Sequence, residues 1–147
     1  MSYTQRFTEG YQPGGELYPA LRTPAAYNGA WIQLSNHQRV VFIVQVGTMV
    51  ATSTLNFLVQ EDILGDGASL AAIAGKAITQ LTQAGGDGDD LVAVEVRTEE
   101  LNVDGGFCWV RGVLTVGVAN VTCAMLPLRF VANYPPVVVT GWTEVIP

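Results

Sequence analysis

The sequence has little of the chemistry that enzymes and metal proteins use. Among its 147 residues are two cysteines, Cys108 and Cys123, and a single histidine, His37. Nucleophilic catalysis needs a base that is itself oriented by a third group, and nothing around His37 marks such a set. A closed zinc site combines several cysteine and histidine ligands, which this composition cannot supply. We therefore expect no catalytic residue, no metal and no cofactor, and we expect His37 to be an exposed turn residue.

Positive charge and long apolar runs are also scarce. Seven Lys and Arg residues stand against thirteen Asp and Glu, giving a net charge of -6. Nucleic-acid affinity comes largely from Lys and Arg, so we expect no nucleic-acid partner. The sequence has no run of about 18 uncharged apolar residues that would span a membrane. No apolar segment follows a basic one at the N-terminus, which predicts no secretory signal and synthesis in the cytoplasm.

Apolar residues make up 49% of the chain, and charged residues only 14%. A chain of this length fits one domain and buries roughly 68–70% of its unfolded surface. Large exposed apolar patches are uncommon on monomers and tend to mark interfaces. The composition therefore predicts that neighbouring subunits cover part of the surface.

Two acidic clusters have simple interpretations. The turn Asp87–Asp90 lacks the ligand spacing and closing Glu of a calcium loop, which favours a solvated turn over a Ca²⁺ site. Glu99 and Glu100 are adjacent and point apart on a strand or turn, which favours solvation over paired acid and base catalysis.

Residues 1–29 predict an extended arm, because prolines and glycines recur there without helical or strand periodicity. Disordered tails are usually poor in aromatic residues, whereas this segment carries five. We infer that the arm docks, either on its own domain or on a neighbour. The candidate partner-contact residues are its aromatic side chains, Tyr3, Phe7, Tyr11, Tyr18 and Tyr27.

The rest of the chain reads as short strands separated by glycine and aspartate turns. Residues 39–47 are apolar on both faces, as in a central strand, whereas 54–60 and 91–97 alternate like half-buried strands. A short strand is expected at Trp31–Ser35. Residues 69–83 fit either helical spacing or a strand, and we favour an irregular stretch followed by a strand at 76–82. The result is an all-β domain, a β-sandwich or jelly-roll-like fold.

Near the C-terminus, 106–116 and 121–131 are expected to form a hairpin around Gly117–Asn120. That register holds Cys108 and Cys123 roughly 20 Å apart along the strands, so we expect two free, buried thiols. Pro127 predicts a sheet edge or a bulge. The expected division is an arm at 1–29, a sandwich domain at 30–136 and a C-terminal strand or tail at 137–147.

Several stretches resemble a known group of proteins. They are GKAITQLTQAGGD at 75–87, VEVRTEELNVDGGF at 94–107, Val110-Arg111, residues 113–117, and Tyr134-Pro-Pro136. Together with the order of the strands, they resemble the head decoration or cement proteins of tailed bacteriophages over residues 30–136. The resemblance implies a β-sandwich that coats the outside of an icosahedral capsid, commonly as a trimer. It also implies contact with the major capsid protein, location in the virion and no enzymatic activity.

Two alternatives remain at this stage. One is a tail-tube or other tail subunit, which is also structural. The other is a carbohydrate-binding adhesin module, with Trp31, Trp109 and Trp142 lining a sugar site, although packing of these rings in the core or an interface is favoured.

Overall fold

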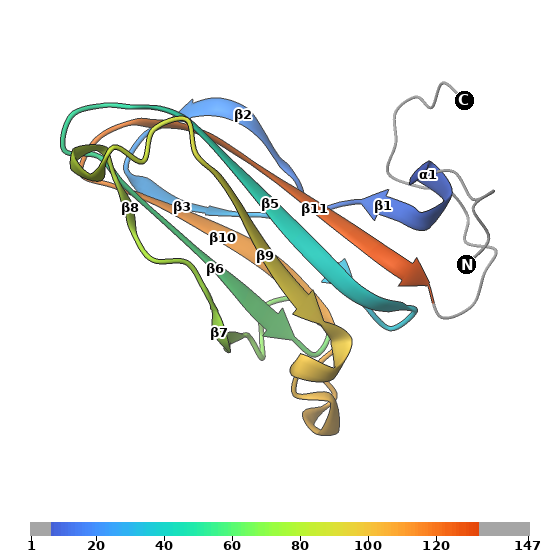
Figure 1. Cartoon of the computed structure of the whole chain (residues 1–147). Coiled ribbons are helices and arrows are strands. Elements are labelled where there is room, and N and C mark those ends of the chain that lie inside the picture. The colour runs from blue at the N-terminus through green and yellow to red at the C-terminus, as the bar shows by residue number, and fades with distance from the viewer. Residues whose placement is uncertain (1–6, 133–147) are drawn as a thin grey trace.

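A computed structural model describes residues 7–132 and shows two antiparallel sheets packed as a β-sandwich (Figure 1). The five-stranded sheet contains β1 (Tyr11–Pro13), β2 (Leu17–Arg22), β5 (His37–Met49), β9 (Leu91–Arg97) and β11 (Val121–Ala132). The six-stranded sheet contains β3 (Ala25–Asn28), β4 (Ile32–Gln33), β6 (Thr54–Asp62), β7 (Ala71–Ala77), β8 (Leu81–Thr82) and β10 (Trp109–Gly117). The helices are short: α1 (Phe7–Gly10), η1 (Gln83–Gly85), η2 (Thr98–Glu100) and η3 (Val103–Gly105). The prediction of an all-β sandwich is confirmed.

The core lies between the two sheets and follows the alternation of the strands. Val40, Phe42 and Val44 of β5 are fully buried, and so are Leu55 and Val59 of β6. Phe42 faces Phe57 of β6 across the core, with ring centroids 5.7 Å apart. Gly112 of β10 leaves room for these rings, because a Cβ there would lie 2.7 Å from Phe57 Cε2. The core therefore has no space for one added methyl group at this position.

Strand β5 is an interior strand, as predicted, and pairs with β11 on one side and β9 on the other. The half-buried strands expected at 54–60 and 91–97 are also confirmed as β6 and β9. The order expected within 69–83 is wrong, because strand β7 comes first and only Leu81–Thr82 forms the later strand β8. Among the described residues, no helix has the length and apolar composition of a membrane span.

The hairpin expected between 106–116 and 121–131 is wrong. Strand β10 pairs with β3, β4 and β6 in one sheet, whereas β11 pairs with β1, β2 and β5 in the other. Residues 118–120 therefore carry the chain from one sheet to the other. Both cysteines are nevertheless free, with Cys123 buried in β11 and Cys108 partly buried before β10.

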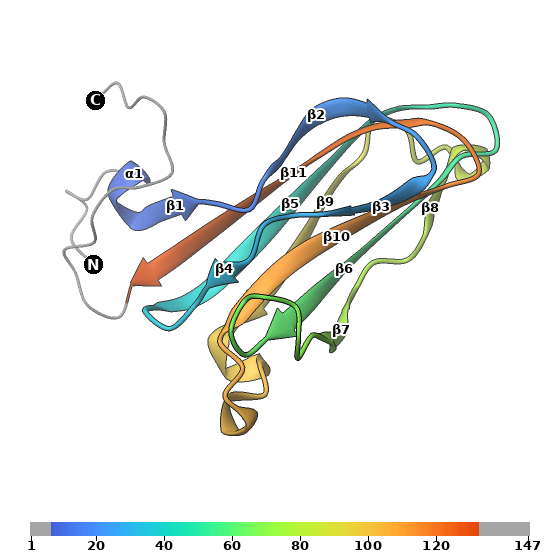
Figure 2. The same ribbon diagram turned by 180° about the vertical axis from the view of Figure 1, so that it is seen from behind.

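Residues 11–28 lie along their own domain. Strands β1 and β2 pair with β11, and the chain then crosses the side of the sandwich so that β3 and β4 pair with β10 (Figure 2). The sequence left open whether this segment docks on its own domain or on a neighbour, and in the structure it pairs with strands of its own domain. Tyr3 and the predicted C-terminal strand at 137–147, with Trp142, lie outside the described residues.

Pro127 lies within β11, a strand that is paired on both sides. On the side away from β5, however, β2 pairs with β11 as far as Met125 and β1 begins opposite Leu128. Pro127 therefore sits at a break in that neighbouring ladder, where its missing N–H costs no sheet hydrogen bond.

Candidate assembly surface

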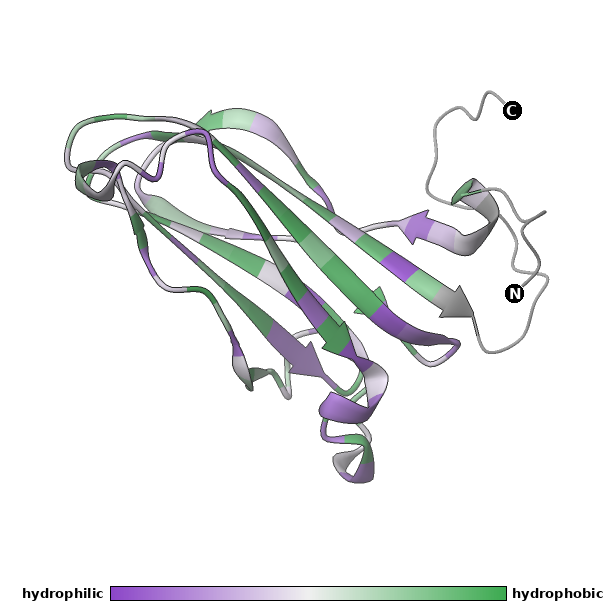
Figure 3. Ribbon diagram, viewed as in Figure 1, coloured by the Kyte–Doolittle hydropathy of each residue, from purple (hydrophilic) through white to green (hydrophobic). Residues whose placement is uncertain are grey.

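The outward side of the five-stranded sheet carries apolar residues at its centre, although the core lies on its other side. On β5, Val41 and Ile43 alternate with the core residues and so point outward. Leu128 and Leu126 of β11 stand directly opposite them. Figure 3 colours the stretch of β5 after its hydrophilic His37 end as hydrophobic. The outer face is hereafter this surface, formed by Val41, Ile43, Leu91, Ala93 and Leu126. Ala124 and Leu128 lie on the same side but are buried, and Gln45 and Glu95 add polar groups to it.

The strand register arranges the outer face in rows. Ile43 lies between Leu126 and Ala93, and the next row places Gln45 between Ala124 and Leu91. Leu91 is 70% exposed and Leu126 is 37% exposed. Three strands about 4.8 Å apart, over seven residues rising about 3.3 Å each, span about 300 Å² of sheet, and the exposed apolar side chains occupy part of that area.

One end of the outer face is aromatic and carries arginines. The register there aligns Tyr11, Phe130, Arg39 and Arg97 across four strands. The guanidinium of Arg39 lies 5.2 Å from the centre of the Phe130 ring and 2.9 Å from Glu95 Oε1. Arg97 lies 3.4 Å from Glu99 Oε1, and both side chains are largely exposed.

The opposite end of the outer face is acidic. There the turn that precedes Leu91 presents Asp89 and Asp90, which are both exposed. The backbone holds this turn against β5, because Val46 N–H donates to the Asp90 carbonyl at 2.9 Å. Asp87 has a structural role, since its Oδ2 accepts the Thr82 N–H at 2.7 Å. The outer face is thus bounded by paired Arg and Glu side chains at one end and by an acidic turn beyond the other.

The aromatic residues predicted for the arm fall in different places. Phe7 is 55% exposed and stacks on Tyr11 at 4.2 Å, and the Tyr11 ring lies 5.3 Å from Phe130 at the arginine end of the outer face. Tyr18 is 72% exposed, and its hydroxyl donates to Glu16. Tyr27 packs against the core, with Arg22 over its ring. The structure therefore brings Phe7 and Tyr11 to the outer face and leaves Tyr18 and Tyr27 away from it.

Two of the tryptophans that suggested an adhesin, Trp31 and Trp109, lie at the six-stranded sheet, just before β4 and at the start of β10. Trp31 is partly exposed, with the Arg111 guanidinium 4.5 Å from its ring centre. Arg111 Nε also donates to Gln60 Oε1 at 2.9 Å, which fixes the cation over the ring. Trp109 is partly exposed beside Gly65, where a Cβ would lie 2.7 Å from the indole. These rings are partly used in packing within the domain.

His37 is buried, so the prediction of an exposed turn residue is wrong. It starts β5 with only 7% of its surface exposed, and its carbonyl accepts the Thr98 hydroxyl at 2.6 Å. The Nδ1 atom has no hydrogen-bond partner among the described residues. Burial lowers the pKa of His37, and the nearby positive charge of Arg129 lowers it further.

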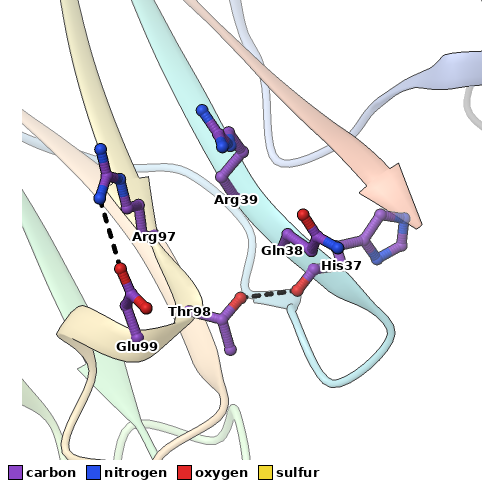
Figure 4. Close-up of a pocket in the computed structure, with 6 residues that line it drawn as sticks. All are labelled: His37, Gln38, Arg39, Arg97, Thr98 and Glu99. Carbon is purple, nitrogen blue, oxygen red and sulfur yellow. Dashed lines mark hydrogen bonds and ion pairs between the residues drawn. The ribbon is translucent and has the colours of Figure 1, made fainter. Parts of the chain in front are cut away.

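A polar pocket of about 400 Å³ opens beside this residue (Figure 4). Its lining residues are His37, Gln38, Arg39, Arg97, Thr98 and Glu99. Figure 4 shows Arg97 and Glu99 paired on one wall and Thr98 reaching the His37 backbone. The His37 ring points away from the two arginines, so these groups do not converge on one ligand position.

The lowered pKa of His37 predicts a pH-dependent stability. The unfolded chain takes up a proton near pH 6.5, whereas the folded chain does so only at lower pH. The free energy of unfolding should therefore fall as the pH drops below about 6.5 and level off below the folded pKa. Urea unfolding from pH 7.5 to 5.5 measures this effect. His37→Gln should flatten the curve, and an unchanged slope in that variant would assign the pH dependence to other groups.

The comparisons with known proteins show the fold and no family. The sequence matches no family model and no curated protein. The structure is similar to that of the PBSX exported protein XepA, with a TM-score of 0.56 and 13% identity. The match covers 99% of this chain and 45% of XepA, so the chain spans less than half of that protein. The shared feature is the β-sandwich architecture.

Two viral structures give weaker matches, each over 86% of this chain. Broad bean stain virus matches with a TM-score of 0.43, 18% identity and 65% of that chain covered. Infectious bursal disease virus, Gx strain, matches with a TM-score of 0.39, 15% identity and 31% covered. Similarity at these scores carries no argument about function.

Proposed function

We propose that the protein is a structural virion subunit that decorates and stabilises the icosahedral capsid of a tailed phage. The observation that carries the proposal is the outer face, where Val41, Ile43 and Leu126 leave the centre of a sheet apolar on its solvent side. Burial of such a surface stabilises an assembly by about 25 cal/mol for each Å² removed from water. A surface of this kind suits a subunit that works by contact with other subunits.

Two further observations support the proposal. The stretches at 75–87 and 94–107 resemble phage head decoration proteins. The fold, moreover, is shared with part of the phage exported protein XepA. In this role the protein bridges major capsid subunits on the exterior of the capsid and associates with itself, as a trimer if it follows the proteins that it resembles. The role requires no catalysis, cofactor, nucleic acid or membrane.

The test is to separate heads from tails of purified virions and to quantify the protein in each fraction by mass spectrometry. We expect it in heads, at a stoichiometry comparable with that of the major capsid protein. Enrichment in tails would replace the decoration role with a tail-tube or adhesin role. Absence from both fractions would overturn the structural virion role.

A further inference from the structure

We propose that Lys76 and Glu100 form a latch that closes the free edge of β9 and keeps the chain from pairing, edge to edge, with other copies of itself. Lys76 is the only lysine of the chain. Strand β9 ends the five-stranded sheet, with β5 on one side and no strand of the described residues on the other, which is here the free edge. The latch is a property of the fold, so the inference does not depend on the proposed capsid role.

The free edge presents backbone groups that another strand could bind. Unpaired N–H and C=O groups at a sheet edge are a template for strands of other chains. In an antiparallel pair, successive residues point these groups alternately toward the partner strand and away from it. Val46 N–H donates to the Asp90 carbonyl at 2.9 Å, so Asp90 and every second residue after it face β5. The residues whose backbone groups face the free edge are therefore Leu91, Ala93, Glu95 and Arg97.

The latch takes up two of these backbone groups. Lys76 Nζ donates to the Glu95 carbonyl at 2.7 Å and lies 2.7 Å from Glu100 Oε2. The same carboxylate oxygen of Glu100 accepts the Arg97 N–H at 2.8 Å. The cation and the carboxylate thus hold each other in place, while each binds a group that an incoming strand would need.

Strand β7 is bent in a way that delivers Lys76 to β9. It pairs with β6 before and after residues 73–76, and these four residues lie opposite a single residue of β6, Val59. Gly75, immediately before Lys76, has a φ of +74°, which an L side chain rarely adopts. Bulges of this kind change the direction of a side chain. Here the bulge directs Lys76 from the six-stranded sheet to the edge of the five-stranded sheet.

The latch is more confined than an ordinary surface ion pair. The side chain of Lys76 is only 18% exposed, and that of Glu100 is 38% exposed. The Arg97 N–H, and after it Lys76, lower the pKa of Glu100, so the carboxylate is ionised at neutral pH. A lysine at a sheet edge is one of the devices by which proteins prevent edge-to-edge aggregation.

The register of β9 shows which pairing the latch prevents. Ala93 lies midway along the free edge and is exposed. A second β9 placed antiparallel and centred on Ala93 would bring Leu91 of one copy opposite Glu95 of the other. The Leu91 N–H would then donate to the Glu95 carbonyl, which Lys76 already occupies. The two copies can pair in this way only when the latch is open.

Replacement of Lys76 by methionine tests the latch, because it removes the ammonium group and keeps an unbranched side chain. We expect the variant to remain folded by circular dichroism. In sedimentation velocity it should self-associate at a protein concentration about tenfold lower than the wild type, the effect of one hydrogen bond to a charged group. Arg22→Met is the matched control. It changes the net charge equally but lies on β2, away from β9, and should associate no more than the wild type.

A second substitution locates the association. Ala93→Pro, made together with Lys76→Met, removes an N–H that faces the free edge and makes no bond to β5, so it blocks strand addition and spares the sheet. We expect the double variant to return to the association of the wild type. Hydrogen exchange of associated Lys76→Met, without the proline, should show the Ala93 and Glu95 amides newly protected.

Two results would overturn the inference. One is a Lys76→Met variant that associates no more than the wild type. The other is association of Lys76→Met in which the Ala93 and Glu95 amides gain no protection, because the contact would then lie elsewhere on the molecule.

Discussion

Replacement of Phe42 by alanine is expected to lower the free energy of unfolding by about 3–5 kcal/mol, as for other buried phenylalanines. The Phe42 side chain is fully buried and its ring faces Phe57 across the core. The cavity left behind has few ways to close, because the neighbouring β10 backbone at Gly112 is already packed against both rings. A domain of this size is stable by about 5–15 kcal/mol, so the variant should be close to unfolding.

Urea unfolding of dilute protein measures this loss, and Ile43→Ala is the matched control. Ile43 is the next residue on the same strand but points to the outer face, where it is partly exposed. Its truncation should cost much less than that of Phe42. Equal losses for the two variants would mean that the assignment of the two sides of β5 is wrong.

Deletion of residues 1–24 is expected to destabilise the whole domain. From the sequence alone, this segment is an arm whose removal should weaken capsid attachment and leave the domain folded. In the structure, the deletion removes β1 and β2 and strips one side of β11 of its partners. At about 0.5–1.5 kcal/mol for each backbone hydrogen bond, the loss is several kcal/mol. Leu17, which packs against the core, is lost as well.

Thermal unfolding followed by circular dichroism tests this expectation. Deletion of residues 1–10 is the control, because it stops before β1 and removes no sheet pairing of the described residues. The longer deletion should unfold at a much lower temperature than the control. Similar melting temperatures would show that the arm contributes little to the domain.

The faces of the strands could be predicted from the sequence because side-chain direction follows a period of two residues. The run from Arg39 to Gly47 is apolar at both odd and even positions, which correctly indicated an interior strand. That interpretation assumed that both faces would be covered. In the described residues, one face of β5 meets the core and the other forms the outer face. The apolar residues of the second face therefore indicated the candidate surface, although the sequence analysis interpreted them as buried within the domain.

The partners of the strands could not be predicted in the same way. Periodicity shows which side chains share a face, but the sequence of a short turn does not show whether the strands on either side of it pair with each other. The turn at 118–120 joins two strands that do not pair, because β10 and β11 lie in different sheets. His37 is a related case. Its polar neighbours suggested exposure, but the end of β11 lies beside it, with Ala132 opposite in register.

Side-chain footprinting with hydroxyl radicals tests the central claim that the outer face is a contact surface between subunits. Protein in intact virions is compared with dilute free protein, and the oxidation of Ile43, Leu91 and Leu126 is measured against that of Leu64. Leu64 is 71% exposed in the loop after β6 and serves as the internal reference. The account predicts that oxidation of the three outer-face residues falls sharply in virions while that of Leu64 changes less. Equal oxidation of the outer face in the two states would contradict it.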